Sequence, residues 1–210
     1  VTGLPVDPIM GSYVEQPGAP VLTIRNSCAG STSEIAITQS RFVGSSGAMP
    51  PAQTWTVPAC FKTGDGAPRC ELITAREARA TASGCDALFA NADARGYYFS
   101  EYTPMAVRDL GRAAPALKPV ERLSLLGDEW WMVRSGRHDI SSFLDLSAML
   151  ATDDTPAVVE TIATRLTLVS HAIADRGQDA AFERWIRDRF GPAPAGIGLP
   201  RDAPDADERE

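Results

Sequence analysis

The feature that most constrains the fold is a change of hydrophobic period across residues 88–129, which read LFANADARGYYFSEYTPMAVRDLGRAAPALKPVERLSLLGDE. Apolar residues before this stretch alternate as they do in strands, whereas those after it recur at helical spacing. Thr103 can cap a helix, and Pro104 fits the first turn of that helix. The sequence therefore predicts a β module that is joined here to a helical module.

The first half of the chain predicts a short helix over residues 7–14 and then seven or so short strands. Residues 75–82 are ambiguous, because their propensity favours a helix whereas their setting among strands favours a strand. Pro58 implies that its strand lies at a sheet edge or carries a bulge. Short strands at this close spacing are typical of a small antiparallel sandwich. The other expected strands cover residues 21–26, 34–42, 53–61, 69–74, 88–90 and 96–102.

The second half predicts five helices with short connections, which make successive helices antiparallel as in a bundle or solenoid. Pro119 begins the second helix, Asp139 can cap the third, and Pro156 begins the fourth. The fifth covers residues 181–190. Helical spacing predicts these inward residues: Val107, Leu110, Leu123, Leu126, Trp130, Val133, Ile140, Phe143, Leu144, Met149, Val158, Ile162, Leu166, Val169, Ile173, Phe182, Trp185 and Ile186.

Four cysteines, Cys28, Cys60, Cys70 and Cys85, all lie in the β half and permit three full pairings. Cys60 and Cys70 flank a Gly/Pro turn, so a bridge between neighbouring strands is easy there. The alternatives are free thiols in a cytosolic protein and two disulfides in an exported one. Clustering in one module favours the second, and with it a periplasmic or secreted location over a cytoplasmic one.

Candidate catalytic residues are few. His138 is predicted to be a surface residue beside a helix cap, and His171 a partly buried packing residue. Asp128 and Glu129 are predicted to face solvent or to pair with Arg122 or Arg134. A zinc site is disfavoured, since there is no Cys-x-x-Cys and both histidines lie in the helical half. These residues form no constellation that could run a reaction.

The net charge of the chain limits the kinds of partner that it can bind. A net charge of −7 argues against nucleic acid or an anionic membrane as the main partner. The sequence also has no apolar run of membrane-spanning length.

The junction resembles that of the aminopeptidase N-like (puromycin-sensitive aminopeptidase-like) family of zinc metallopeptidases, of the gluzincin type. The family patterns PNAxGxGYYRxxY and LxPxERxxLLxDxWxLVRxG correspond here to FANADARGYYFSEY and LKPVERLSLLGDEWWMVRSG. The segments VDPIMGSYVEQPGAPVLTI, ITQSRF and WTVPACFKT also resemble the family, in the right order, so that residues 1 to about 190 are covered.

The resemblance implies an immunoglobulin-like antiparallel sandwich followed by an all-α antiparallel array, the start of an α-solenoid. Residues 1–17 would be the tail of a catalytic domain and residues 18–102 the sandwich. Residues 103–192 would be the first helices of the C-terminal domain, and residues 193–210 a truncated, poorly ordered end. The residues expected to pack at the domain junction are Tyr97, Tyr98, Tyr102, Met105 and Leu110.

The resemblance further implies the non-catalytic C-terminal portion of a zinc-dependent aminopeptidase that removes N-terminal residues from peptides. The sandwich would be a spacer, and the helices would partly cover the active site. The motif His-Glu-x-x-His and the stretch Gly-x-Met-x-Asn are absent, so no catalytic or metal-binding residue carries over. We therefore expect this chain to be inactive alone and to bind no cofactor, with zinc held in the full-length parent.

The expected partners are the catalytic domain of the same polypeptide and, in the whole enzyme, the peptide substrate. The alternative is a stand-alone protein-binding or scaffolding module. Two departures from the family pattern stand at the junction. Phe99 replaces an arginine, and Lys118 replaces the usual helix-capping Ser/Thr, which should weaken that cap by about 1 kcal/mol.

Overall fold

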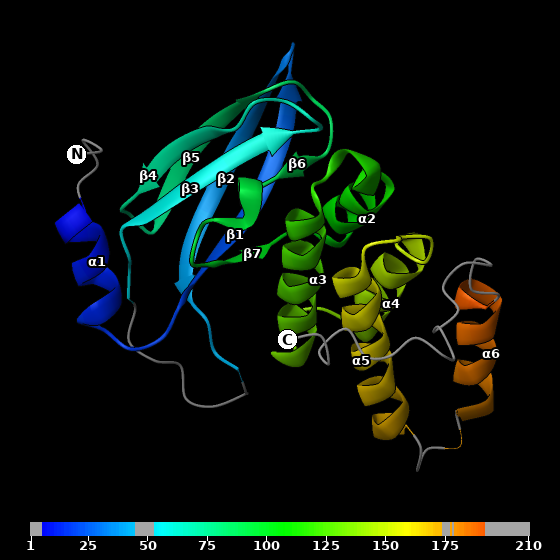
Figure 1. Cartoon of the computed structure of the whole chain (residues 1–210). Helices are drawn as coiled ribbons and strands as arrows, with labels where there is room; N and C mark the ends of the chain where they lie inside the picture. The colour runs from blue at the N-terminus through cyan, green and yellow to red at the C-terminus, as the bar shows by residue number, and fades with distance from the viewer. Residues whose placement is uncertain (1–5, 45–52, 174–176, 178, 192–210) are drawn as a thin grey trace, which may run out of the picture. The chain divides into compact units, whose positions relative to one another are not determined.

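The computed structural model describes residues 6–44, 53–173, 177 and 179–191. The chain divides into two compact units, residues 1–163 and residues 164–210. The first unit holds a short helix, two sheets and the first of the helices that follow them, so the predicted order of a β module and then a helical module is confirmed (Figure 1). The boundary expected between residues 102 and 103 lies inside this unit. The immunoglobulin-like pattern and the start of a solenoid remain predictions.

The β module contains a four-stranded and a three-stranded sheet, which face each other in Figure 1. The first has the order β5-β2-β1-β7, and the second has the order β4-β3-β6. The strands are β1 (Pro20–Ala29), β2 (Thr32–Arg41), β3 (Val57–Thr63), β4 (Arg69–Ile73), β5 (Glu77–Ser83), β6 (Leu88–Phe89) and β7 (Phe99–Glu101).

One strand pair departs from the all-antiparallel expectation, because β7 runs parallel to β1. A parallel pair needs a long crossover rather than a tight hairpin. Between β1 and β7 the chain passes through the other sheet, and this provides the crossover. β7 thereby places the last residues of the β module beside β1, directly before the helices begin.

Two local predictions for the strands are confirmed. Trp55, Val57, Ala59 and Phe61 are all fully buried, as their shared face requires. Pro58 lies opposite β4, but β6 pairs with β3 only at residues 62–63, so the other side of β3 is a local edge at Pro58.

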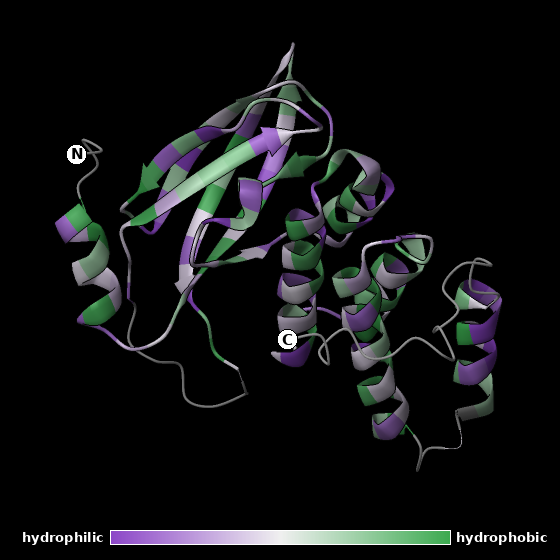
Figure 2. Ribbon diagram, in the orientation of Figure 1, coloured by the Kyte–Doolittle hydropathy of each residue, from purple (hydrophilic) through white to green (hydrophobic). Residues whose placement is uncertain are grey.

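The ambiguous segment 75–82 contributes to strand β5. Hydrophilic and hydrophobic residues alternate along it (Figure 2), and Ala80 and Ala82 are buried. β5 also pairs antiparallel with β2, with Ala82 opposite Ser33. Pairing and one-sided burial therefore overrode its helical propensity.

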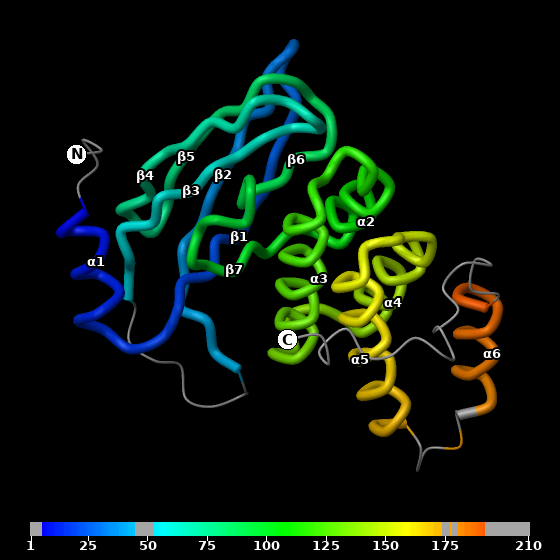
Figure 3. Tube along the Cα trace, in the orientation of Figure 1, coloured from blue at the N-terminus to red at the C-terminus, as the bar shows by residue number. Residues whose placement is uncertain are grey.

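The helices begin close to where the sequence predicted. Figure 3 follows the chain from β7 directly into α2, where the Thr103 hydroxyl accepts a hydrogen bond from the Ala106 N–H at 3.2 Å. Thr103 thus caps α2 as predicted. The helices are α1 (Val6–Val14), α2 (Pro104–Arg112), α3 (Pro119–Arg134), α4 (Ile140–Met149), α5 (Pro156–Ile173) and α6 (Asp179–Phe190), with 3₁₀ turns η1 (Ala92–Ala94) and η2 (Ala114–Ala116).

The predicted inward face of α3 is partly wrong. Leu126 and Trp130 are buried, but Leu123 and Val133 are only half-buried. α3 packs against both α4 and β7, so its buried surface is wider than one stripe. The buried residues of α3 are Glu121, Leu125, Leu126, Asp128, Glu129, Trp130 and Met132.

The other helices follow their predicted stripes more closely. Val107 and Leu110 in α2, Phe143 in α4, and Val158 and Ile162 in α5 are buried. Ile140 is exposed, contrary to prediction, because it is the first residue of α4. In the second unit the predicted residues Leu166, Val169 and Phe182 are buried.

Two disulfides join the cysteines, Cys28 with Cys85 and Cys60 with Cys70. Cys60 and Cys70 lie directly opposite each other on β3 and β4, with Cα atoms 4.0 Å apart. None of the helices in the described ranges combines the length and the apolar character needed to cross a bilayer.

Candidate functional site

The loop that leads into the junction is fastened at Ala90. The Tyr98 hydroxyl donates to the Ala90 carbonyl, and the Ala90 N–H donates to the Tyr102 hydroxyl at 2.8 Å. Asn91 closes the same loop, because its side chain accepts from the Gly96 N–H at 2.8 Å and donates to the Gly96 carbonyl at 3.1 Å. The sequence FANADARGYY therefore forms a loop closed by side-chain hydrogen bonds.

The five residues expected to pack at the junction fall into two groups. Tyr98, Tyr102 and Leu110 are buried. Tyr97 and Met105 are 74% and 70% exposed and do not pack there. Tyr97 instead makes an edge contact with Tyr13 of α1, with ring centroids 5.8 Å apart.

Burial also affects the tyrosine hydroxyls at the junction. It raises the pKa of both Tyr98 and Tyr102 above the usual tyrosine value. Both therefore remain neutral hydrogen-bonding groups at physiological pH.

Phe99, which stands where the family pattern has an arginine, has an aromatic setting. Its ring lies 4.5 Å from that of Phe42 and 6.5 Å from that of Trp131, measured between centroids. Trp131 comes from α3 and Phe42 directly follows β2, so the cluster links the two modules. An apolar contact thus occupies the place where an arginine was expected.

Glu121 on α3 is the first polar link between the modules. Its carboxylate lies 2.7 Å from the Lys62 ammonium of β3, and both side chains are buried. It also accepts from the Lys118 N–H at 2.8 Å and from the Asp93 N–H at 2.9 Å. Glu121 thereby supplies one half of a capping box, which compensates for the missing Ser/Thr at Lys118.

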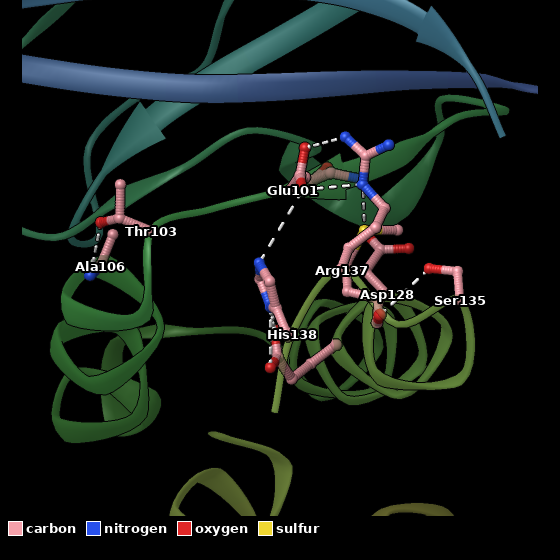
Figure 4. A network of polar contacts seen from close by, with 10 residues as sticks. Glu101, Thr103, Ala106, Asp128, Ser135, Arg137 and His138 are labelled. Atoms are coloured by element: carbon pink, nitrogen blue, oxygen red, sulfur yellow. Dashed lines mark hydrogen bonds and ion pairs between the residues drawn. The ribbon is translucent and has the colours of Figure 1, made fainter. Parts of the chain in front are cut away.

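Glu101, on β7, is the second link. Its carboxylate accepts from the Arg137 Nε at 2.8 Å and from Arg137 Nη2, and Figure 4 shows this pair. The Thr23 hydroxyl of β1 also donates to it. Burial acts to raise the pKa of Glu101, but the hydrogen bonds from Arg137 and Thr23 and the charge of Arg137 outweigh burial, so its pKa is lowered.

His138 lies next to Glu101 and points toward it (Figure 4). Its Nδ1 is 2.9 Å from Glu129 Oε2, and its Nε2 is 4.0 Å from Glu101 Oε1. The His138 side chain is only 7% exposed and that of Glu129 only 2%. The hydrogen bond to Glu129 raises the pKa of His138, and it outweighs the opposing effect of burial.

Asp128 completes the group, which we call the junction network: Thr23, Ser100, Glu101, Asp128, Glu129, Arg137 and His138. Asp128 Oδ2 accepts from the Ser100 N–H of β7 at 3.0 Å. Burial raises the pKa of Asp128 to about 8, so this carboxyl is largely protonated at neutral pH. The network therefore places one largely neutral acid beside the carboxyl groups of Glu101 and Glu129, the guanidinium of Arg137 and the imidazole of His138.

The predictions for these residues were largely wrong. Asp128 and Glu129 are buried rather than solvent-facing, and His138 is not a surface residue. Arg122 instead pairs with Asp153 at 2.6 Å, and the Arg134 guanidinium lies 6.0 Å from the Trp130 ring centroid. The predicted packing residue His171 is exposed.

Two sequence signals could have revealed buried carboxyl groups on α3. Glu129 comes four residues after Leu125 and three before Met132, so it lies on a buried stripe of α3. Glu121 similarly stands three residues after the helix cap at Lys118, which is the position of a capping-box glutamate. Arg137 carried no comparable signal, because its partner Glu101 is 36 residues away.

The junction network can hold a proton and fix two modules, but it offers substrate no access to His138. Zinc does not fit here. Among the described residues no group of three or more histidine, cysteine or acidic side chains could hold a metal ion. All four cysteines are in disulfides, and both nitrogens of His138 face carboxylates.

Comparisons with known proteins match a family model and, among individual proteins, an aminopeptidase. The family model described as the ERAP1-like C-terminal domain matches residues 87–210, a range that begins at β6 and includes the junction. The puromycin-sensitive aminopeptidase of Caenorhabditis elegans is 26% identical over 161 residues, which are 73% of this chain and 17% of that protein. The chain thus spans less than a fifth of that relative.

Proposed function

The chain belongs to the ERAP1-like C-terminal domain family, and we propose that it is the non-catalytic C-terminal portion of a zinc-dependent aminopeptidase. The family match over residues 87–210 carries this proposal. Similarity to an aminopeptidase over 73% of the chain supports the same class of parent protein. Zinc and the catalytic groups would then be held by a part of the polypeptide outside these residues.

In the parent enzyme the β module would act as a spacer, and the helices would partly cover the active site and limit access of the peptide substrate. The buried pair of Glu121 with Lys62 and the partly buried pair of Glu101 with Arg137 support a fixed posture of α3 on the β module. Such a posture is what a cover over an active site requires. Removal of N-terminal residues from peptides is the reaction proposed for the parent.

α1 offers a surface for the catalytic domain. Val6, Met10 and Val14 follow one another at four-residue intervals, and all three are exposed. Residues four apart share one face of a helix, so they form an apolar stripe. The preceding part of the same polypeptide is the partner that we propose for it.

We further propose a periplasmic or secreted location. Two disulfides support it, since disulfides persist in oxidising compartments. Thiol titration of the natural protein in denaturant should find no free cysteine in residues 1–210. Four free thiols would contradict an exported location.

The proposal is tested by comparing this chain with its full-length parent. We expect the chain alone to hydrolyse no aminoacyl-amide substrate and to carry no stoichiometric zinc by elemental analysis. The parent should carry one zinc and lose activity on chelation. A parent gene that encodes no metal motif before residue 1 would instead favour the binding or scaffolding module.

A further inference from the structure

We propose that His138 is a proton-dependent lock between α3 and the β module: the protonated imidazole holds Glu129 and Glu101 together, and loss of its proton loosens the segment 135–139 from β7. The lock is a property of this chain, and it does not depend on the function proposed above. It rests on the placement of one imidazole between two carboxylates from different elements.

The first observation is geometric. His138 Nδ1 contacts Glu129 of α3 at 2.9 Å, and His138 Nε2 faces Glu101 of β7 at 4.0 Å. Both ring nitrogens carry hydrogens only in the protonated imidazole. Only that form can therefore donate toward both carboxylates at once.

The second observation is the balance of charge around the ring. The charged groups that act on His138 are Glu129 from α3, Glu101 from β7 and Arg137 from its own segment. Within the described residues neither α2 nor α4 places a charged side chain within ion-pair distance of the His138 ring. With His138 protonated, two negative charges meet two positive ones. Without that proton, one negative charge is in excess.

The excess charge would fall on a poorly solvated group. The Glu129 side chain is 2% exposed, and among the described residues His138 is the side chain that forms a hydrogen bond with it. A buried carboxylate that loses its charged partner is strongly unfavourable. Separation of the segment 135–139 from β7, which lets water reach Glu129, relieves that cost.

The third observation identifies the part that can move. The Arg137 and His138 N–H groups both donate to the Met132 carbonyl, at 2.9 and 3.2 Å, after a turn at Gly136 with φ 72°. This turn brings the side chains of Arg137 and His138 toward β7. Among the described residues, the polar side-chain contacts between the segment 135–139 and β7 are those of Arg137 and His138 with Glu101.

The direction of the titration agrees with the geometry. The pKa of His138 is raised, so the folded state retains the proton more strongly than the unfolded state does. The stabilisation is fully present below the unfolded-state pKa, near 6.5. It is lost as the pH rises through the higher folded-state value.

The first experiment is an NMR titration of the histidine Cε1–H signals in the unaltered chain. There are only two histidines, and a His171→Asn variant assigns them. We expect His138 to titrate above pH 6.5. A His138 midpoint at or below 6.5 would overturn the lock, and this result needs no variant at His138.

The second experiment measures amide hydrogen exchange of Arg137 and His138 between pH 5.5 and 9, corrected for intrinsic rates. Release of one proton allows the opening constant to rise up to tenfold per pH unit. Amides of the β1–β2 ladder, which report global opening, serve as the internal reference. We expect a rise at Arg137 and His138 that exceeds this reference.

Two variants distinguish the effect of His138 on the pH dependence from that of the nearby Asp128. His138→Gln should open the segment at every pH and abolish the extra dependence. Asp128→Asn, which keeps an acceptor for the Ser100 N–H, should change how the reference amides depend on pH but leave the extra dependence at Arg137 and His138 intact. An unchanged dependence in His138→Gln, or its loss in Asp128→Asn alone, would assign the effect elsewhere and reject the lock. If His138→Gln does not fold, the titration of the unaltered chain decides.

Discussion

Arg137 donates two hydrogen bonds to Glu101, and this pair ties the segment after α3 to the last strand of the β module. Two parallel donors fix the guanidinium in one orientation, which a single ammonium cannot do. Glu101 is simultaneously held by Thr23 of β1, so the pair connects a helix end to two strands. Its consequences for stability are measurable.

Replacing Arg137 tests this pair. The Arg137 side chain is 34% exposed, so solvent screens part of the interaction. We expect Arg137→Ala to lower the free energy of unfolding by about 1–2 kcal/mol, and Arg137→Lys to lower it by less. Urea unfolding measures both. Arg95→Ala is the matched control, since that arginine is 81% exposed and should change stability by less than about 0.5 kcal/mol. Equal effects at the two sites would contradict the assignment.

Glu121 and Lys62 form a deeper pair. Glu121→Ala leaves the Lys62 ammonium buried without a charged partner and should cost about 3–5 kcal/mol. The double variant Glu121→Gln with Lys62→Met removes both charges and should be less destabilised than the sum of its single variants. A coupling energy near zero in this cycle would show that the two side chains do not interact.

Asp128 should make stability fall as the pH rises. Its pKa is about 8 in the folded chain and about 3.9 in the unfolded chain, so the folded state binds the extra proton between these values. Asp128→Asn should remove this loss and be stabilising relative to the natural chain at pH 9, by at most about 5 kcal/mol. The two proteins should differ little below pH 4. Parallel profiles from pH 4 to 9 would exclude a raised pKa.

The pKa of Glu101 is shifted in the opposite direction, so its effect on stability as the pH changes is reversed. Its lowered pKa stabilises the fold above the unfolded-state pKa of about 4.3, and this stabilisation is lost as the pH falls through the folded-state value. Glu101→Gln should therefore lessen acid destabilisation. The two ends of the pH profile thus report different carboxyl groups of one network.

The loop 91–96 offers a test of backbone geometry. Ala94 has φ 51°, in the left-handed region that favours glycine. Ala94→Gly should stabilise the chain by about 0.5–1 kcal/mol, because relief of strain exceeds the added entropy of the unfolded state. Thermal and urea unfolding would both detect the gain. A loss of stability would mean that Ala94 is not strained.

The same loop predicts the reverse at Gly96. An added Cβ there would lie 2.8 Å from Tyr98 Cδ1 and 3.0 Å from Asn91 Oδ1, so Gly96→Ala should cost about 1–3 kcal/mol. Gly127→Ala is the matched control. A Cβ at Gly127 meets nothing within 4 Å, and alanine should stabilise α3 by about 0.5–1 kcal/mol.

Local signals in the sequence predicted well those features that depend on neighbouring residues. The cap at Thr103, the starts of α3 and α5, and the buried face of β3 all follow from patterns within a few positions. The segment 75–82 could not be assigned in this way, because its strand pairs with β2, whose partner residues lie 39 to 49 positions earlier.

The junction network was missed for a related reason. Charged residues on helices are usually solvated. No sequence pattern around Asp128 predicts its hydrogen bond with Ser100, and none around Glu129 predicts its contact with His138. Burial on two sides of α3 brought these groups together. The family resemblance gave the order of the modules, but it did not give the groups that join them.

The two tyrosine bonds to Ala90 have a consequence for the order of assembly. Their partners are only 8 and 12 residues apart in sequence, whereas the bond from Thr23 to Glu101 spans 78 residues. Closing a short loop costs less chain entropy than closing a long one. The turn around Ala90 can therefore form early in folding and position β7 before the long-range contacts are made. Pairing of β1 with β7 is then the slower, later step.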